Sequence, residues 1–172
     1  MAIETGGYTE KQLRRMVRQW VPRERVPQKV RVRDTADFFR VDYDDVVVLD
    51  GVPFFVRNNE REGRFGLEDE PKFWVKRAIN LVTGEVKVLK WVFRERFSAR
   101  IGGLVFECVR SPQKEARILE LVRGRPDFMQ GKSVPDSTGN PLRILDYIRG
   151  KTLSEVIVTL GADHQEFFYR YY

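Results

Sequence analysis

Residues 73–93 read FWVKRAINLVTGEVKVLKWVF, and this stretch decides the fold class. Its two ends, 73–79 and 86–93, are rich in β-branched and aromatic residues, which favour strands. The segment between them contains Thr83-Gly84, a pair that is typical of turns. The stretch therefore predicts two consecutive strands joined by a short turn.

Further strands are predicted on both sides of this pair. Upstream, residues 38–57 read FFRVDYDDVVVLDGVPFFVR, and Asp50-Gly51 between two apolar runs is a signal for a two-residue type I′ hairpin. Downstream, residues 129–134 and 142–147 are two more candidate strands, separated by a polar turn sequence.

Residues 111–124, SPQKEARILELVRG, give the clearest helix signal in the chain. Ser111 suits the N-cap, Pro112 suits the first helical position, and Gly124 suits the end of the helix. The order of elements predicts an α+β fold, in which an antiparallel β-sheet of about five strands carries one long helix on one face. An N-terminal helix and hairpin complete the prediction.

The N-terminal segment, residues 1–33, holds all of the excess positive charge. The chain has 31 Lys and Arg against 25 Asp and Glu, a formal charge of +6. Residues 1–33 contain nine of the basic residues and three of the acidic ones, so the remaining 139 residues have a net charge of zero. Within this segment, 9–20 predicts a helix capped by Thr9, with Leu13, Met16, Val17 and Trp20 on one face. The segment is either a solvated helix and linker or an arm for an acidic partner, nucleic acid or anionic lipid.

Composition excludes several classes of protein. The chain of 172 residues is long enough for one domain or for one lobe of a larger protein. No apolar run is long enough to span a membrane, and the N-terminus carries no secretion signal, so a cytoplasmic location is expected. Cys108 and His164 are the only residues of their types, which excludes an internal disulfide framework and a zinc site built from several cysteines or histidines.

The order of elements, together with particular residues, resembles the N-terminal, ATP-binding lobe of the protein-kinase-like superfamily. Residues 87–90, KVLK, are similar to the lysine motif of that lobe's third strand, and 114–119, KEARIL, are similar to its following helix. Residues 143–153, RILDYIRGKTL, resemble the strand, gatekeeper and hinge that follow, with Leu145 at the gatekeeper position. The resemblance spans roughly residues 52–160.

This resemblance implies an ATP site with magnesium. Lys90 would hold phosphates and Glu115 would hold Lys90. The side chains of Val75, Ala78, Val88 and Leu145 would line the adenine slot, and the backbones of Asp146 and Ile148 would face the edge of the base. Residues 62–66, EGRFG, resemble part of the glycine-rich phosphate loop and nominate Gly63 and Gly66, although Arg61 occupies the first glycine position.

The family's catalytic motifs lie in a C-terminal lobe, and the sequence contains none of them. We therefore expect the chain by itself to be inactive and to be completed by a missing C-terminal lobe, into which a helix starting in 161–172 would lead. The expected divisions are 1–33 as a basic helix and arm, 34–160 as the kinase-like lobe, and 161–172 as the start of that helix. The alternatives are a non-catalytic kinase-fold interaction module and a nucleic-acid-binding domain that uses the basic arm.

Overall fold

The computed structural model describes residues 6–36, 39–60, 72–91, 96–101, 103–109 and 112–150. The elements, in chain order, are α1 (Glu10–Trp20), the short 3-10 helix η1 (Arg23–Arg25), β1 (Arg31–Arg33), β2 (Asp45–Leu49), β3 (Val52–Glu60), β4 (Lys72–Asn80), β5 (Val86–Lys90), β6 (Arg96–Ile101), β7 (Leu104–Val109), α2 (Pro112–Leu121), β8 (Gly131–Pro135) and β9 (Pro141–Asp146).

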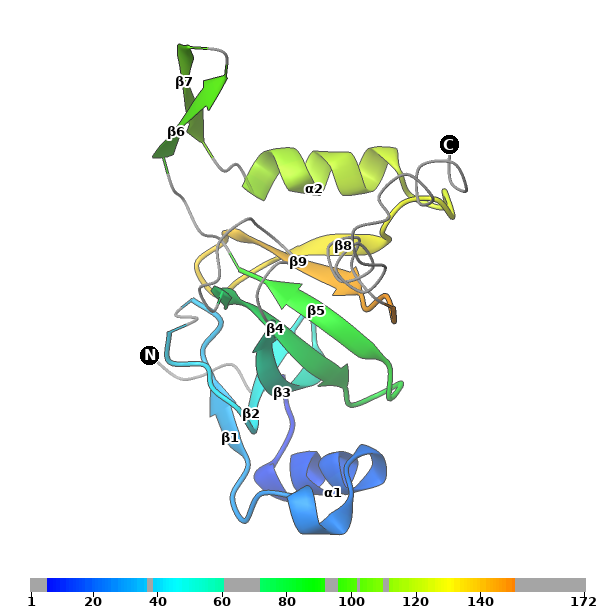
Figure 1. The fold of residues 1–172 in the computed structure, drawn as a ribbon. Helices are drawn as coiled ribbons and strands as arrows, with labels where there is room; N and C mark the ends of the chain where they lie inside the picture. Colours follow the sequence, from blue (N-terminus) through cyan, green and yellow to red (C-terminus); the bar gives the residue numbers. More distant parts are fainter. Residues whose placement is uncertain are drawn as a thin grey trace, which may run out of the picture.

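The main sheet has seven strands in the order β1-β2-β3-β4-β5-β9-β8, and β6 and β7 form a separate hairpin that projects beyond α2 (Figure 1). The α+β class is confirmed, but the prediction of about five strands is wrong. The sheet is also mixed, because β1 pairs with β2 in parallel while the other neighbours are antiparallel. Strand β1 alternates Arg31-Val32-Arg33, but three residues are too few for a strand pattern to be recognised in the sequence.

Two turns follow directly from their glycines. Leu49 pairs with Val52 across the β2–β3 turn, and Asp50 and Gly51 have φ values of 53° and 72°. The predicted two-residue type I′ hairpin is therefore confirmed. Between β4 and β5, Gly84 has a φ of 78° and lies under the indole of Trp20, where an added Cβ would come within 2.5 Å of the ring.

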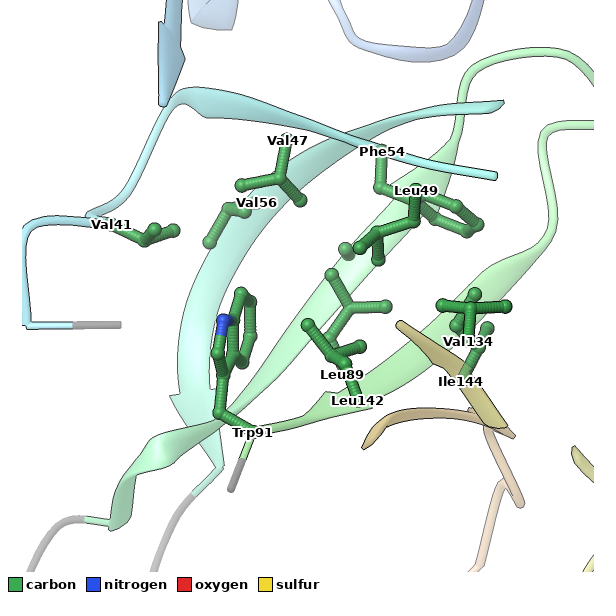
Figure 2. Close-up of a cluster of buried hydrophobic side chains, with 11 residues drawn as sticks. Val41, Val47, Leu49, Phe54, Val56, Leu89, Trp91, Val134, Leu142 and Ile144 are labelled. Atoms are coloured by element: carbon green, nitrogen blue, oxygen red, sulfur yellow. The ribbon is translucent and has the colours of Figure 1, made fainter. Parts of the chain in front are cut away.

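The larger core lies on the inner face of the sheet (Figure 2). It joins Val47 and Leu49 of β2 to Val134 of β8 and Ile144 of β9, with Trp91 at the end of β5. In a flat sheet β2 and β8 would be about 24 Å apart at the usual strand spacing. The sheet is therefore strongly curled.

Polar contacts join the two ends of the curled sheet. Lys132 on β8 forms a 2.8 Å ion pair with Asp50 in the β2–β3 turn. The Ser137 backbone N–H donates to Thr35 Oγ1 at 2.9 Å, and Trp91 Nε1 donates to the carbonyl of Thr35 at 2.7 Å. These contacts bring the segment after β1 onto the turn between β8 and β9.

Both helices lie on the outer face of the sheet and at opposite ends of the molecule (Figure 1). Phe55 and Leu81 pack with Leu13 and Val17 of α1, so α1 shares a hydrophobic core with the sheet. A capping box between Thr9 and Gln12 begins α1, as predicted for Thr9. No helix in the described part of the chain is long and apolar enough to cross a membrane.

The helix expected at 111–124 is present on the sheet but is shorter than expected. Helix α2 has 10 residues and α1 has 11. Helix α2 ends at Leu121 rather than running to residue 124, because the chain turns there and Gly124 adopts a φ of 74°.

Candidate functional site

Lys90 and Glu115 meet on the outer face of the sheet. Lys90 ends β5 and Glu115 lies in the first turn of α2, and Lys90 Nζ is 2.8 Å from Glu115 Oε1. Strand alternation places Lys90 on the same face as Val88, which is the face that α2 covers. A carboxylate in the first turn of a helix is favoured by the helix dipole. The two residues nominated from separate motifs therefore form one ion pair.

Arg143 joins this pair, and the sequence analysis assigned it no role. Lys90 and Arg143 are direct partners across β5 and β9, so their side chains lie next to each other on the outer face. Arg143 Nε is 3.4 Å from Glu115 Oε2, so each carboxylate oxygen faces a different cation. The signal that could have found Arg143 is a basic residue in an otherwise apolar strand, PLRILD, directly opposite a candidate lysine.

The Arg143 side chain is only 2% exposed and is anchored at several points. Its Nη1 donates to the carbonyl of Pro141 at 2.9 Å, and its Nη2 donates to the carbonyl of Trp91 at 3.1 Å. Its Nε is buried without a hydrogen bond, because the 3.4 Å approach to Glu115 is an ion-pair contact only. Burial lowers the pKa of the Arg143 guanidinium and Glu115 opposes that shift. The group stays charged, as arginine does in proteins.

Three of the four side chains expected to line the adenine slot lie together beside this ion-pair cluster. Val75, Val88 and Leu145 form one buried group on the outer face. Three partly buried side chains pack over it: Leu119 of α2, Met129 and Tyr147. The slot expected from the resemblance is therefore filled by the chain's own side chains.

The fourth expected side chain, Ala78, lies on the opposite face of the sheet, contrary to the prediction. Ala78 belongs to the inner core with Leu89 and Trp91. It lies three residues after Val75 on the same strand, and positions three apart on a strand point to opposite faces. Ala78 is therefore not placed to line a slot that Val75 and Val88 share.

The two hinge residues differ in their surroundings. The Asp146 backbone N–H donates to the carbonyl of Gln130 at 2.9 Å, so this donor is already used. The Asp146 carboxylate lies 2.8 Å from Lys87 Nζ, and Lys87 also pairs with Glu85 at 3.1 Å. Ile148 follows β9 and its side chain is 58% exposed. Gly63 and Gly66, residues 151–160 of the expected kinase-like lobe and the segment 161–172 lie outside the described residues.

A pocket with a volume of about 300 Å³ lies on the inner side of the sheet. Leu49, Phe54 and Ile144 contribute to its apolar floor, and Lys87 and Lys132 stand at its rim. Both rim lysines are paired, Lys87 with Asp146 and Lys132 with Asp50. This pocket is therefore separate from the Lys90–Glu115 pair, which lies on the outer face.

The described residues contain no group of three or more His, Cys, Asp or Glu side chains arranged to hold a metal ion. Comparison with family models, with curated proteins and with solved structures gave no match for this chain.

Proposed function

We propose that this chain is the nucleotide-binding lobe of a protein-kinase-like phosphotransferase, with Lys90 as the phosphate-binding cation. The observation that carries the proposal is the 2.8 Å contact between Lys90 Nζ and Glu115 Oε1, which joins a strand to a helix 25 residues later. The two residues belong to separate sequence motifs, KVLK at 87–90 and KEARIL at 114–119. Their meeting is a condition that the proposal had to satisfy.

The chemistry of the pair suits phosphate binding. An ammonium forms short, charge-assisted hydrogen bonds with phosphate oxygens, and a fixed carboxylate orients it. The Lys90 side chain is 20% exposed, so part of it faces solvent. Arg143 holds the second oxygen of Glu115 from a buried position, so Glu115 keeps one anchor when Lys90 turns toward a phosphate.

The packing beside the pair sets the expected affinity. Leu119, Met129 and Tyr147 cover Val75, Val88 and Leu145, so a base can enter only where these covering side chains move aside. Tyr147 is itself held, because its hydroxyl accepts a hydrogen bond from Arg77 Nη1 at 3.2 Å and its ring lies beneath that guanidinium. We therefore propose weak, millimolar nucleotide binding by this chain alone. In the superfamily that it resembles, the metal ligands and the catalytic base are supplied by the other lobe.

The test is a titration of the isotope-labelled chain with MgATP, in which binding is monitored through the NMR chemical shifts of the backbone amides. We expect shifts that cluster on β4, β5, β9 and the first turn of α2. Replacing Lys90 with Met should weaken binding at least about tenfold, the equivalent of one lost charge-assisted hydrogen bond. The matched control is Lys87→Met, which removes an ion-paired lysine from the inner face of the same strand. It should change the affinity less than about twofold, because Lys87 lies on the face away from Glu115.

Three results would contradict the proposal. One is equal weakening by the two variants, which would indicate nonspecific attraction of the anion. Another is a set of shifts confined to the inner pocket around Lys87 and Lys132. The third is the absence of any shift at millimolar MgATP while the chain remains folded.

A further inference from the structure

The outer surface of α1 carries several exposed cations. Lys11, Arg15 and Arg18 are exposed. At 100° per residue they fall opposite the stripe of Leu13 and Val17, which is buried against the sheet. The three cations therefore form a row about 10 Å long, pointing away from the molecule.

The structure divides the nine basic residues of the N-terminal segment into separate groups. Arg31 and Arg33 both pair with the buried Asp45, at 2.7 and 3.0 Å, so one of their two positive charges is balanced within the fold. Arg14, within α1, is half-buried. Within the described residues, six others are exposed and have no carboxylate partner: Lys11, Arg15, Arg18, Arg23, Arg25 and Lys29.

The burial of Leu13 and Val17 favours a nucleic acid over an anionic membrane as the partner of this helix. An amphipathic helix binds a membrane by inserting its apolar face between lipids. In α1 that face is already packed against Phe55 and Leu81, and the exposed side presents cations rather than apolar residues. A phosphate backbone needs no inserted apolar group, and arginine binds phosphate oxygens through two parallel hydrogen bonds.

We propose that the basic face of α1, extended by Arg23 and Arg25 of η1 and by Lys29 after it, docks on the phosphate backbone of a nucleic acid through Lys11, Arg15, Arg18 and these three residues. Its recognition is electrostatic and independent of sequence. The face lies at the end of the molecule away from α2 (Figure 1), so it acts separately from the Lys90–Glu115 pair. This inference does not depend on the proposed nucleotide site.

The test measures binding of labelled duplex RNA, single-stranded RNA and duplex DNA by fluorescence anisotropy at several salt concentrations. The affinity should fall steeply with salt for at least one of these probes. The triple variant Lys11→Gln, Arg15→Gln, Arg18→Gln should weaken binding at least about tenfold and reduce the slope of log affinity against log salt by about 3, near one per lost phosphate contact. Thermal unfolding should be close to wild type, because all three side chains are exposed.

The matched control removes the same charge elsewhere. Arg117, Arg123 and Arg125 are exposed on and after α2, and replacing all three with Gln should change the affinity less than about twofold. The variant Lys90→Met should also leave nucleic-acid binding unchanged, which separates this proposal from the nucleotide site. Equal losses in the two triple variants would overturn the proposal. The absence of binding to all three nucleic acids at low salt would also overturn it. Binding of phosphatidylserine vesicles or polyglutamate in their place would count as the same result.

Discussion

The two helices lie on the same outer face of one sheet, yet they are held in different ways. Helix α1 has two fully buried apolar side chains, Leu13 and Val17, and these contact the strands β2 and β3. In α2 the only buried residue is Pro112, while Ile118 and Leu121 are 47% and 72% exposed. Helix α2 is attached through half-buried Leu119 and through the two contacts of Glu115.

The two helices therefore differ in how strongly their attachment to the sheet can respond to a bound ligand. Burying Leu or Val side chains contributes about 1.5–3 kcal/mol each, so α1 is fixed mainly by apolar packing, with one hydrogen bond from Trp20 Nε1 to the carbonyl of Leu81 at 3.0 Å. Helix α2 depends on an ion-pair cluster, and the energy of such a cluster changes when one of its members binds something else. The fixed helix carries the basic face on its outer side, and the ion-paired helix carries the candidate nucleotide site.

The largest expected effect comes from weakening the apolar attachment of α1. The variant Leu13→Ala should lower the free energy of unfolding by about 3 kcal/mol, through lost burial and the cavity that remains. Its control is Leu121→Ala on α2, which should cost less than about 0.5 kcal/mol because that side chain is largely exposed. Urea unfolding measures both. Similar losses in the two variants would show that the helices are attached in the same way.

An intermediate effect is expected from the ion-pair cluster of α2. Glu115→Gln leaves the guanidinium of Arg143 buried without its carboxylate, which should cost about 1–2 kcal/mol, less than for a fully buried pair because Glu115 is 40% exposed. Arg143→Met should cost less, because Glu115 keeps Lys90 and the new side chain is apolar. Urea unfolding of both variants checks this order, and a larger loss for Arg143→Met would mean that its hydrogen bonds to Trp91 and Pro141 outweigh the pair.

The smallest effect is expected from the hydrogen bond between Asp34, just after β1, and Ser137 in the β8–β9 turn. Asp34 accepts hydrogen bonds from Ser137 Oγ and from the Ala36 backbone N–H, and these bonds lower the pKa of its carboxyl below the ordinary 3.8. The stabilisation is therefore complete above that value and is lost as the pH falls through the lower pKa of the folded state. Asp34→Asn should cost about 1 kcal/mol or less at pH 7.

The difference in unfolding free energy between wild type and Asp34→Asn should shrink as the pH falls below 3.8. Chemical unfolding at a series of pH values measures that difference. A gap that stays constant down to the lowest pH would show that the Asp34 charge does not contribute to the joint between β1 and the β8–β9 turn.

Much of the fold could be predicted because its signals are local. The Asp50-Gly51 pair specified a turn whose φ values are positive in the structure, and Thr9 specified the start of α1. The short parallel strand β1 could not be predicted, because three residues are too few for a pattern and its partner β2 begins 14 residues later in the chain. The hairpin of β6 and β7 was also missed.

The candidate site was predictable only in part. Motif resemblance nominated Lys90 and Glu115, and the structure brings them together. The same resemblance grouped Ala78 with Val75, although their three-residue spacing on one strand separates them. Arg143 was missed because its role depends on which residue lies across from it on β5.

The sequence alone determined the local features of this protein: its turns, its helix starts, its alternating strands and the concentration of positive charge before residue 34. Each depends on residues that are close neighbours in the chain. The tertiary structure, in contrast, sets which charged side chains form ion pairs and which stay exposed to solvent. Asp45 takes up Arg31 and Arg33 while Lys11, Arg15 and Arg18 stay exposed, and Glu115 lies between Lys90 and Arg143. The physical reason is that ion pairing depends on distances of a few ångströms, and strand register and sheet curl set those distances between residues far apart in the chain.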